Sequence, residues 1–289
     1  MAPLVAMGDW RCASLSGLSV QAMAGLMDQA YAGYLVPVQF EAAGLLRRVL
    51  AEHIDLQASQ QLFDGDEPVG ILLVARRGRD SRIAALGVVP AFRGRGLGAW
   101  ALQRAREQAC ERGDRCLSLE VIDGNAAARA VYDKAGFVAR RRLVGYRHDG
   151  AGPGGRIQVA PVQTLIERCL RAYPADMTWQ ASPLCLAGVA SPLLGFESRD
   201  GAAVAVVDPI APVLRLVAFA VDPARRRQGL GRRFMRDLLG HFPGRSWVIP
   251  AILPDTLADG FLRATAWERT SLTQSEMILA LDEAAPVPG

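Results

Sequence analysis

The chain has few histidines, and its cysteines do not stand at the spacing of a metal site. Three histidines accompany five cysteines in 289 residues. No Cys-x-x-Cys pair occurs among the cysteines, which are Cys12, Cys110, Cys116, Cys169 and Cys185. The common zinc sites require such clusters. We therefore expect reduced thiols, most of them buried, and no bound metal.

A large charge of either sign is also missing. The formal net charge is +4 at pH 7, and the arginines gather at a few places instead of forming one stripe. This distribution argues against a general nucleic-acid binder. No apolar stretch approaches the length needed to cross a bilayer, and the N-terminus does not resemble a secretory signal. We expect no nucleic-acid or membrane partner and a cytoplasmic location. Abundant alanine, glycine and arginine with almost no lysine suggest a GC-rich bacterial source.

What the chain does contain is typical of soluble globular proteins. Hydrophobic residues make up 51% and charged residues 21%, so disorder is expected only at the ends. A length of 289 residues is long for one domain and comfortable for two.

One internal repeat supports two domains. Residues 88–98 read VVPAFRGRGLG and residues 221–231 read VDPARRRQGLG, and the two segments align without a gap, so that Gly98 corresponds to Gly231. Each copy follows an apolar run typical of a buried strand and precedes apolar residues at helical spacing. Between the copies, residues 149–155 have the glycine-rich composition of a linker. We predict an N-terminal domain at 1–149 and a C-terminal domain at 156–289.

The pattern of elements predicts a mixed α/β sheet. The first half reads as a strand, two helices, three strands, a helix, a strand, a helix and two strands, the last two near 137–141 and 143–146. The second half repeats the later part of this order after a helix at 162–172, and its last strand is predicted at 275–281.

The repeated turn is suited to bind an anion. Its Arg-x-x-Gly-x-Gly pattern leads from a strand into a helix, whose first N–H groups and dipole favour a phosphate or pyrophosphate. Neither the dinucleotide fingerprint nor the P-loop sequence is present. The alternative for a single copy is an ordinary tight connection, and two copies make that alternative weaker.

This turn and the strand before it resemble the acetyl-CoA pyrophosphate turn of the GCN5-related N-acetyltransferases (GNAT). The resemblance implies two tandem GNAT folds, in each of which two strands splay apart around the pantetheine arm. It implies that the pantetheine binds the backbone of Leu86, Gly87, Val88 and Val89, and that the pyrophosphate binds Arg93, Gly94, Arg95, Gly96, Leu97 and Gly98. In the second copy, Arg226, Gly229 and Gly231 are the corresponding coenzyme contacts.

A second segment, residues 119–137, extends the resemblance. Asn125 suits a helix N-cap and Gly136 a left-handed helix end. The family's second motif implies that Asn125 contacts the pantetheine and that Tyr132 is the general acid for the departing thiolate. A phenol has an ordinary pKa of about 10 and a thiol about 8.5, so the proton transfer is plausible chemistry. The alternative is a tyrosine packed for its ring alone.

Other polar and aromatic residues are candidates for the acceptor side. Glu120 is the best-placed carboxylate to accept the proton of the amine, although a glutamate there could instead pair with an arginine. Tyr31 and Tyr34 are candidates for the wall of the acceptor site, and ordinary packing is equally plausible for them.

The second half departs from the family pattern. When Ala266 is aligned with Gly136, Leu262 stands opposite Tyr132, and leucine cannot donate a proton. We therefore expect a catalytic first domain and a degenerate second one.

The predicted function is transfer of an acetyl group from acetyl-CoA to a primary amine, on a small molecule or a peptide, by direct attack. The alternative is a non-catalytic protein that binds or senses acyl-CoA. The oligomeric state, monomer or homodimer, is open.

Overall fold

The structure of the chain, a computed structural model, describes residues 9–188 and 192–281. The chain passes from a first compact unit to a second between Arg140 and Arg141, and it returns to the first between Ser275 and Glu276. The predicted linker at 149–155 therefore lies inside the second unit. The end of the described chain belongs to the first unit, whereas the sequence analysis assigned it to the second domain.

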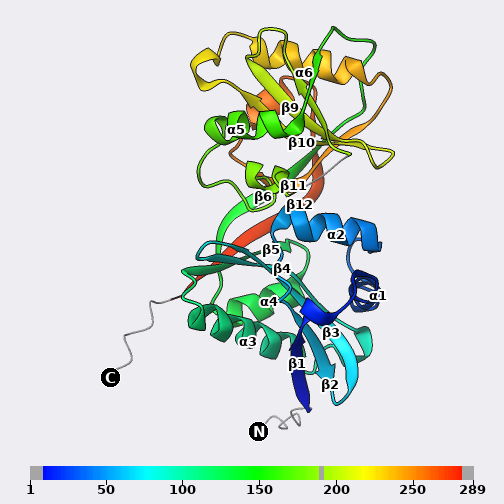
Figure 1. Cartoon of the computed structure of the whole chain (residues 1–289), viewed down its shortest axis with the longest axis vertical. Helices are drawn as coiled ribbons and strands as arrows, with labels where there is room; N and C mark the ends of the chain where they lie inside the picture. The colour runs from blue at the N-terminus through cyan, green and yellow to red at the C-terminus, as the bar shows by residue number, and fades with distance from the viewer. Residues whose placement is uncertain (1–8, 189–191, 282–289) are drawn as a thin grey trace. The chain divides into compact units, whose positions relative to one another are not determined.

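The first unit contains a mixed sheet with helices on both faces (Figure 1). Its elements are β1 (Trp10–Ser14), η1 (Leu15–Gly17), α1 (Val20–Ala30), α2 (Ala42–Glu52), β2 (Gln60–Asp64), β3 (Glu67–Arg77), β4 (Asp80–Val88), η2 (Pro90–Phe92), α3 (Leu97–Glu111), β5 (Cys116–Ile122) and α4 (Ala126–Lys134). The strand order is β1-β2-β3-β4-β5 and then the end of β12 (Glu268–Ala280). Strands β1 to β4 pair antiparallel, whereas β4 and β5 pair parallel.

Strand β3 lies at the centre of this unit. Its residues 69–75 are all buried, because helices cover both faces of the sheet. On one face α3 contributes residues at helical spacing, among them Leu97, Ala101 and Ala105. The end of β12 completes this core with Met277, Leu279 and Leu281.

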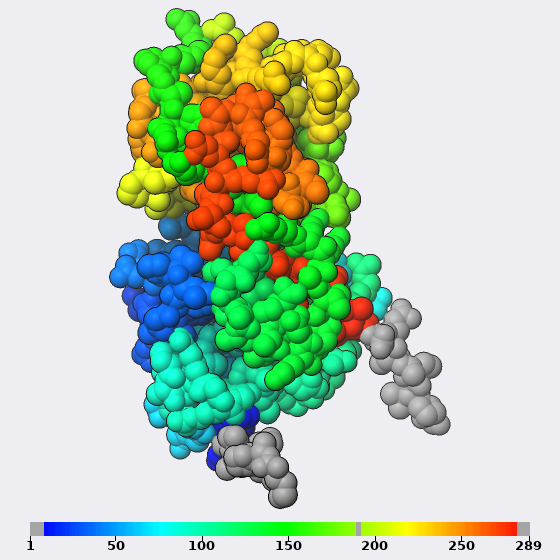
Figure 2. Space-filling view, turned by 180° about the vertical axis from the view of Figure 1, so that it is seen from behind, coloured from blue at the N-terminus to red at the C-terminus, as the bar shows by residue number. Residues whose placement is uncertain are grey.

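The last described residues therefore pack within the first unit. A Cβ atom on Gly136 would meet the side chain of Leu279 at 3.4 Å. In Figure 2, the red atoms at the end of the described chain lie beside the green atoms that follow α4.

The second unit has the corresponding architecture. Its elements are the main part of β6 (Val138–His148), β7 (Gln158–Ala160), α5 (Val162–Ala172), η3 (Pro183–Leu186), β8 (Leu194–Glu197), β9 (Ala203–Asp208), β10 (Leu214–Val221), η4 (Pro223–Arg225), α6 (Leu230–His241), β11 (Trp247–Pro254), α7 (Asp259–Arg263) and the start of β12. The strand order is β12-β6-β11-β10-β9-β8-β7.

Most predicted elements are confirmed, with three differences. The two strands predicted near 137–141 and 143–146 are one strand, β6. The last strand, β12, begins at Glu268 instead of near 275. The short elements β7 and α7 carry too few residues for a recognisable period, and the sequence analysis did not predict them.

In both units the strand that leads into the glycine-rich turn, β4 or β10, has a bulge at the same place. In the β3–β4 pair the register shifts so that Ala84 is an extra residue, and in the β9–β10 pair the extra residue is Val217. Ala84 and Val217 are aligned when Gly98 is aligned with Gly231, so the bulge belongs to the repeat. A bulge bends its strand and ends regular pairing.

The parallel pairing stops just before each bulge. The β4–β5 register ends at Ile83 and Leu119, and the β10–β11 register ends at Arg215 and Val248. In both units the two parallel strands therefore splay apart toward the end that leads into the glycine-rich turn.

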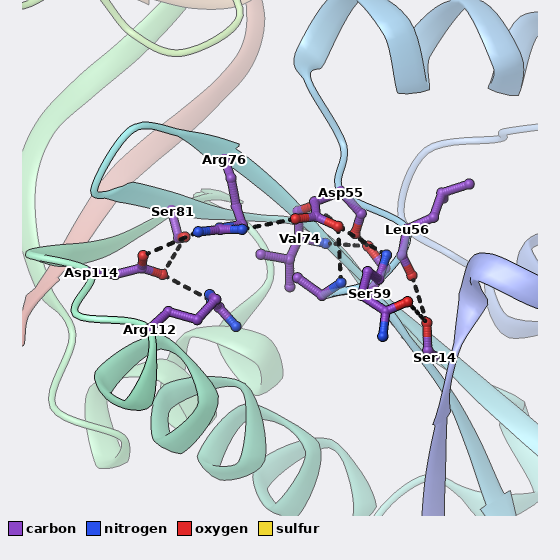
Figure 3. Close-up of polar contacts among 11 residues, drawn as sticks. Ser14, Asp55, Leu56, Ser59, Val74, Arg76, Ser81, Arg112 and Asp114 are labelled. Carbon is purple, nitrogen blue, oxygen red and sulfur yellow. Dashed lines mark hydrogen bonds and ion pairs between the residues drawn. The ribbon is translucent and has the colours of Figure 1, made fainter.

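A polar cluster fixes the opposite end of these strands in the first unit (Figure 3). The buried carboxylate of Asp114 accepts hydrogen bonds from Ser81 at 2.7 Å and from Arg112 at 2.8 Å. Arg76 reaches Asp55 at 2.9 Å, and the Ser59 hydroxyl accepts the N–H of Val74 at 2.9 Å. The cluster ties β4 to the segment before β5, so the strands stay together there and separate only beyond the bulge.

Among the described residues, the cysteines are all free thiols; Cys169 and Cys185 are buried and the other three half-buried. No group of three or more His, Cys, Asp and Glu residues in that part of the chain is arranged to hold a metal ion. No helix there is long and apolar enough to cross a membrane.

Candidate functional site

The glycine-rich turn has the same backbone conformation in both units. In the first unit Gly94 and Gly96 have φ angles of 77° and 95°, and Gly96 is the N-cap of α3. In the second unit Arg227 and Gly229 have φ angles of 66° and 77°, and Gly229 is the N-cap of α6. Neither N-cap offers a side-chain acceptor. Both turns therefore suit an anion from outside the chain.

The first arginine of each turn contacts the protein's own backbone. Arg93 donates to the carbonyl groups of Val88, Ala30 and Ala32 at 2.9–3.0 Å. Arg226 donates to Val221 at 3.2 Å and to Ala172 at 2.5 Å. Each arginine thus joins the last carbonyl of the splayed strand to the C-terminal end of a helix, α1 in the first unit and α5 in the second. In this arrangement the arginine shapes the turn, and the backbone N–H groups at the start of the helix stay available to an anion.

A tyrosine that follows each of these helices reaches the edge of the splayed strand. The Leu86 N–H lies near enough to the hydroxyl of Tyr31 to lower the pKa of that phenol. A Cβ atom on Gly87 would lie 2.7 Å from the Tyr31 ring, so the glycine lets the ring lie against the strand. In the second unit, the Phe219 N–H donates to the hydroxyl of Tyr173 at 2.9 Å.

Tyr132 on α4 packs against the same core cluster as Leu86 and Val88 of β4, and the phenols of Tyr31 and Tyr34 are near enough to affect it. Burial raises the pKa of Tyr132 well above its usual range, and the neighbouring phenols Tyr31 and Tyr34 raise it further. Burial also raises the pKa of Tyr31 to about 12. Both phenols therefore carry their protons at neutral pH.

The ends of α4 and α7 confirm the alignment of Leu262 with Tyr132. In the first unit Gly136 has a φ of 91°, and the Phe137 N–H donates to the backbone carbonyl of Tyr132 at 3.0 Å. In the second unit Ala266 has a φ of 64°, and the Trp267 N–H donates to Leu262 at 3.0 Å.

The starts of these two helices differ. Asn125 caps α4 by accepting the N–H of Ala128 at 3.1 Å. Helix α7 is shorter and begins after Ala258, so the aligned Asp255 is not its N-cap. Asn125 therefore has a clear structural role, and its contact with a pantetheine arm stays a prediction.

Glu120 belongs to a buried ion network. Its carboxylate accepts from Arg82 at 2.6–3.0 Å, and Arg82 also pairs with Glu52 at 2.7 Å. Glu52 in turn binds Arg48 at 3.1 Å. Burial lowers the pKa of Arg82, but attraction to Glu120 and Glu52 outweighs it, and that pKa lies above its usual range. The sequence analysis gave pairing with an arginine as the alternative role of Glu120, and the structure contains that pair, Glu120 with Arg82.

The remaining predicted coenzyme residues lie at the turn or at the strand end. Val89 donates its N–H to Val69 at 2.9 Å, and Leu97 is buried in the core. Gly98 lies in the first turn of α3. Arg95 is exposed, donates to Ala91 at 3.0 Å and has its guanidinium 5.0 Å from the centre of the Phe92 ring.

The sequence analysis did not identify the corresponding contacts of Tyr31 and Tyr173 with the splayed strands, nor the buried ion network of Arg82. Tyr31 and Tyr173 each come directly after a predicted helix, but they do not fall opposite each other when the two glycine-rich turns are aligned. Arg82 and Arg215 do fall opposite each other in that alignment. Arg215 has no hydrogen-bond partner for its buried Nε among the described residues, so the ion network of Arg82 is not repeated.

The splayed parallel strands, the uncapped turn at a helix start and the two covering helix layers define the GNAT fold. Residues 33–137 match the model of the acetyltransferase (GNAT) family, and that segment contains the turn, Asn125 and Tyr132. The family match supports acyl transfer from an acyl-CoA cosubstrate. No curated protein matches the sequence.

Solved structures share this fold over nearly the whole chain. A GCN5-related N-acetyltransferase from Sphaerobacter thermophilus has a TM-score of 0.68 at 16% identity, covering 94% of this chain and 96% of its own. A tandem GNAT protein from the clavulanic acid biosynthesis pathway has a TM-score of 0.65 at 15% identity, covering 98% and 100%. A putative acetyltransferase from Pyrococcus horikoshii has a TM-score of 0.63 at 15% identity, covering 97% and 92%.

Proposed function

We propose that the first unit transfers the acetyl group of acetyl-CoA to a primary amine by direct attack, with the turn at 93–98 as coenzyme anchor. The observation that carries this is the position of Tyr132 on α4, beside a splayed strand pair and with its proton retained. The pyrophosphate lies against the N–H groups at the start of α3, and the pantetheine follows the free edge of β4.

In this reaction the neutral amine nitrogen attacks the thioester carbon, and the C–S bond breaks. The leaving thiolate takes the proton of the Tyr132 hydroxyl, and the amine loses its proton to a base. The raised pKa of Tyr132 keeps its hydroxyl protonated at neutral pH, so a proton is present when the thiolate leaves. Glu120 is the proposed base, with a water relay as the alternative, since Arg82 already binds both of its oxygens.

The test is release of free thiol from acetyl-CoA with spermidine, glucosamine and a peptide with a free α-amine as acceptors. We expect Tyr132→Phe to lower kcat by about 100-fold and to change the KM for acetyl-CoA little, because general acids contribute at least that much. Tyr146→Phe is the matched control, because the Tyr146 hydroxyl binds Asp259 in the second unit.

The competing proposal is an acyl-CoA-binding or sensing protein without turnover. Coenzyme binding with no thiol release for any amine favours that reading. An unchanged kcat in Tyr132→Phe would remove Tyr132 from the mechanism.

A further inference from the structure

A small cavity of the second unit is lined by none of the predicted coenzyme contacts. It has a volume of about 420 Å³ and is bounded by the segment before β7, the β8–β9 turn and α6. Arg226, Gly229 and Gly231 line a different, larger cavity at the splay of β10 and β11. We call the smaller one the α6 side cavity. Its volume lies in the range of small-molecule sites, about 300–1000 Å³.

In the first unit, two tryptophan rings occupy the corresponding place. Trp10 and Trp100 have their ring centres 6.1 Å apart, and both pack against the core of that unit. When the two glycine-rich turns are aligned, Trp100 falls opposite Arg233. Strand β7 pairs with β8 as β1 pairs with β2, and Gln158 stands in β7 where Trp10 stands in β1. The second unit therefore has polar side chains where the first has a packed aromatic pair.

Close backbone contacts hold the segment before β7 against α6. The Gly154 N–H donates to the carbonyl of Gly240 at 3.0 Å. A Cβ atom on Gly155 would lie 2.6 Å from a carboxylate oxygen of Asp237, so glycine permits this close approach. Arg156 follows directly and lines the cavity. The backbone of this arginine is therefore held in place, although its side chain is exposed.

Hydrogen bonds within the β8–β9 turn hold a second arginine at the cavity. The Ser198 hydroxyl donates to Asp200 at 2.8 Å, and the Ala202 N–H donates to the same carboxylate at 3.2 Å. Asp200 also pairs with Arg225 at 2.8 Å. Arg199 lies between Ser198 and Asp200 in the chain and lines the cavity. The carboxylate of this turn is thus already satisfied, and the neighbouring guanidinium is not used to neutralise it.

Three guanidinium groups of the α6 side cavity are left for a ligand. They belong to Arg156, Arg199 and Arg233, whose side chains make no hydrogen bond or ion pair with any described residue. The two carboxylates of the lining bind other arginines. Like charges around one cavity repel each other, and an anion between them relieves the repulsion. Guanidinium groups also match phosphate oxygens in geometry, because each can donate two parallel hydrogen bonds.

We propose that the α6 side cavity binds a small phosphorylated organic molecule whose negative charge matches the three free guanidinium groups. The half-buried side chains of Ile157 and Leu230 give it an apolar wall for the carbon skeleton. A sugar bisphosphate and a nucleoside diphosphate share this chemistry. The site does not depend on acyl transfer by the first unit, so the proposal stands apart from the proposed function.

The test is calorimetric titration of the full chain with fructose 1,6-bisphosphate, with uridine diphosphate and with inorganic phosphate. We expect at least one of the two organic ligands to bind about 10-fold or more tightly than inorganic phosphate, because it offers more charge and uses the apolar wall. The tighter of the two shows whether the skeleton is a sugar or a nucleoside. Binding of neither organic ligand more tightly than phosphate overturns the proposal.

Arg199→Gln and Arg233→Gln locate the bound ligand. Each removes a charge-assisted contact and should weaken binding by about 10-fold. The matching changes to lysine keep the charge without the paired donors and should recover part of the loss. These side chains are exposed, so we expect the variants to fold as the unaltered chain does.

Arg232→Gln is the matched control. It removes the same charge from the neighbouring position of α6, but Arg232 lines the larger cavity at the strand splay. We expect it to change binding of the phosphorylated ligand little. A loss in Arg232→Gln as large as that in Arg233→Gln, or no loss in Arg199→Gln, would show that the ligand binds elsewhere and would overturn the assignment to the α6 side cavity.

Discussion

At the residue scale, the two units carry different side chains at positions with the same backbone conformation. Gly94 and Arg227 both have positive φ angles, as do Gly136 and Ala266. A residue with a Cβ atom is strained there, by about 1 kcal/mol. The turn is therefore maintained in the second unit against the preference of Arg227, which is consistent with a conformation imposed by the surrounding fold.

This comparison gives a matched pair of stability predictions. A Cβ atom on Gly94 would meet no atom within 4 Å, so Gly94→Ala tests the backbone alone. We expect it to lower the free energy of unfolding by about 1 kcal/mol. Arg227→Gly should change it much less, because relief of strain is offset by the added freedom of the unfolded chain. Urea unfolding followed by circular dichroism measures both, and an unaffected Gly94→Ala variant would refute the argument.

Glu120 is the residue where structure and proposed chemistry compete. Its side chain is only 5% exposed, and Glu120→Gln would leave the buried Arg82 with Glu52 as its remaining carboxylate. We expect a loss of about 3 kcal/mol in the free energy of unfolding, as for other broken buried pairs.

The kcat of Glu120→Gln per folded molecule separates the two roles of Glu120. If Glu120 is the base, the variant loses kcat at every pH while its folded population is intact. If the base is water, kcat per folded molecule stays within a few-fold of the unaltered chain. Arg48→Gln is the comparison, because it removes a charge from the same network without touching Glu120.

At the scale of elements, the bulge decides where the strands open. The hydrophobic patterns of 83–89 and 213–221 predict strands, and the repeat locates their turns, but a pattern of apolar residues does not show an unpaired residue such as Ala84 or Val217. The bulge depends on pairing with β3 or β9, which lies outside the strand itself. The sequence does not predict the contact of Tyr31 with β4 for the same reason. The N–H of Leu86 is available to Tyr31 only where the strands splay apart.

The end of α2 gives a prediction for pH. His53 is its C-cap with a φ of 58°, and its Nδ1 accepts from Arg77 at 2.9 Å. Burial lowers the pKa of His53, and the positive charge of Arg77 lowers it further. Near this pH the unfolded chain binds more protons at His53 than the folded chain does. The contribution of His53 to the free energy of unfolding is therefore present above pH about 6.5 and is lost as the pH falls below it.

We expect His53→Asn to flatten the fall in stability between pH 7 and pH 5, because asparagine tolerates the left-handed conformation and does not titrate. His148, whose pKa is also lowered by burial, remains to produce part of the slope. Urea unfolding at three pH values measures the effect. A slope identical to that of the unaltered chain would show that His53 is not responsible.

At the scale of the whole molecule, the chain passes between the two units twice, so the unit to which a residue belongs does not follow from its position in the sequence. The repeat correctly indicates two similar folds, and its linker was placed by glycine content at 149–155. The units divide instead within β6 and β12, two continuous strands with no turn residues at the division. Glycine-rich composition indicates a flexible linker, but it does not indicate a boundary at which one strand continues from one unit into the other.

The last prediction follows from that crossing. Met277 and Met235 are both fully buried, Met277 in the core of the first unit and Met235 in the core of the second. Each change to alanine should lower the free energy of unfolding by about 2–5 kcal/mol. Only Met277→Ala should destabilise the unit that contains Tyr132, although Met277 and Tyr132 lie far apart in the sequence. Amide hydrogen exchange read by mass spectrometry, unit by unit, distinguishes them. Faster exchange in β10 and α6 for Met277→Ala, with α3 and β4 unaffected, would show that the end of the chain belongs to the second unit after all.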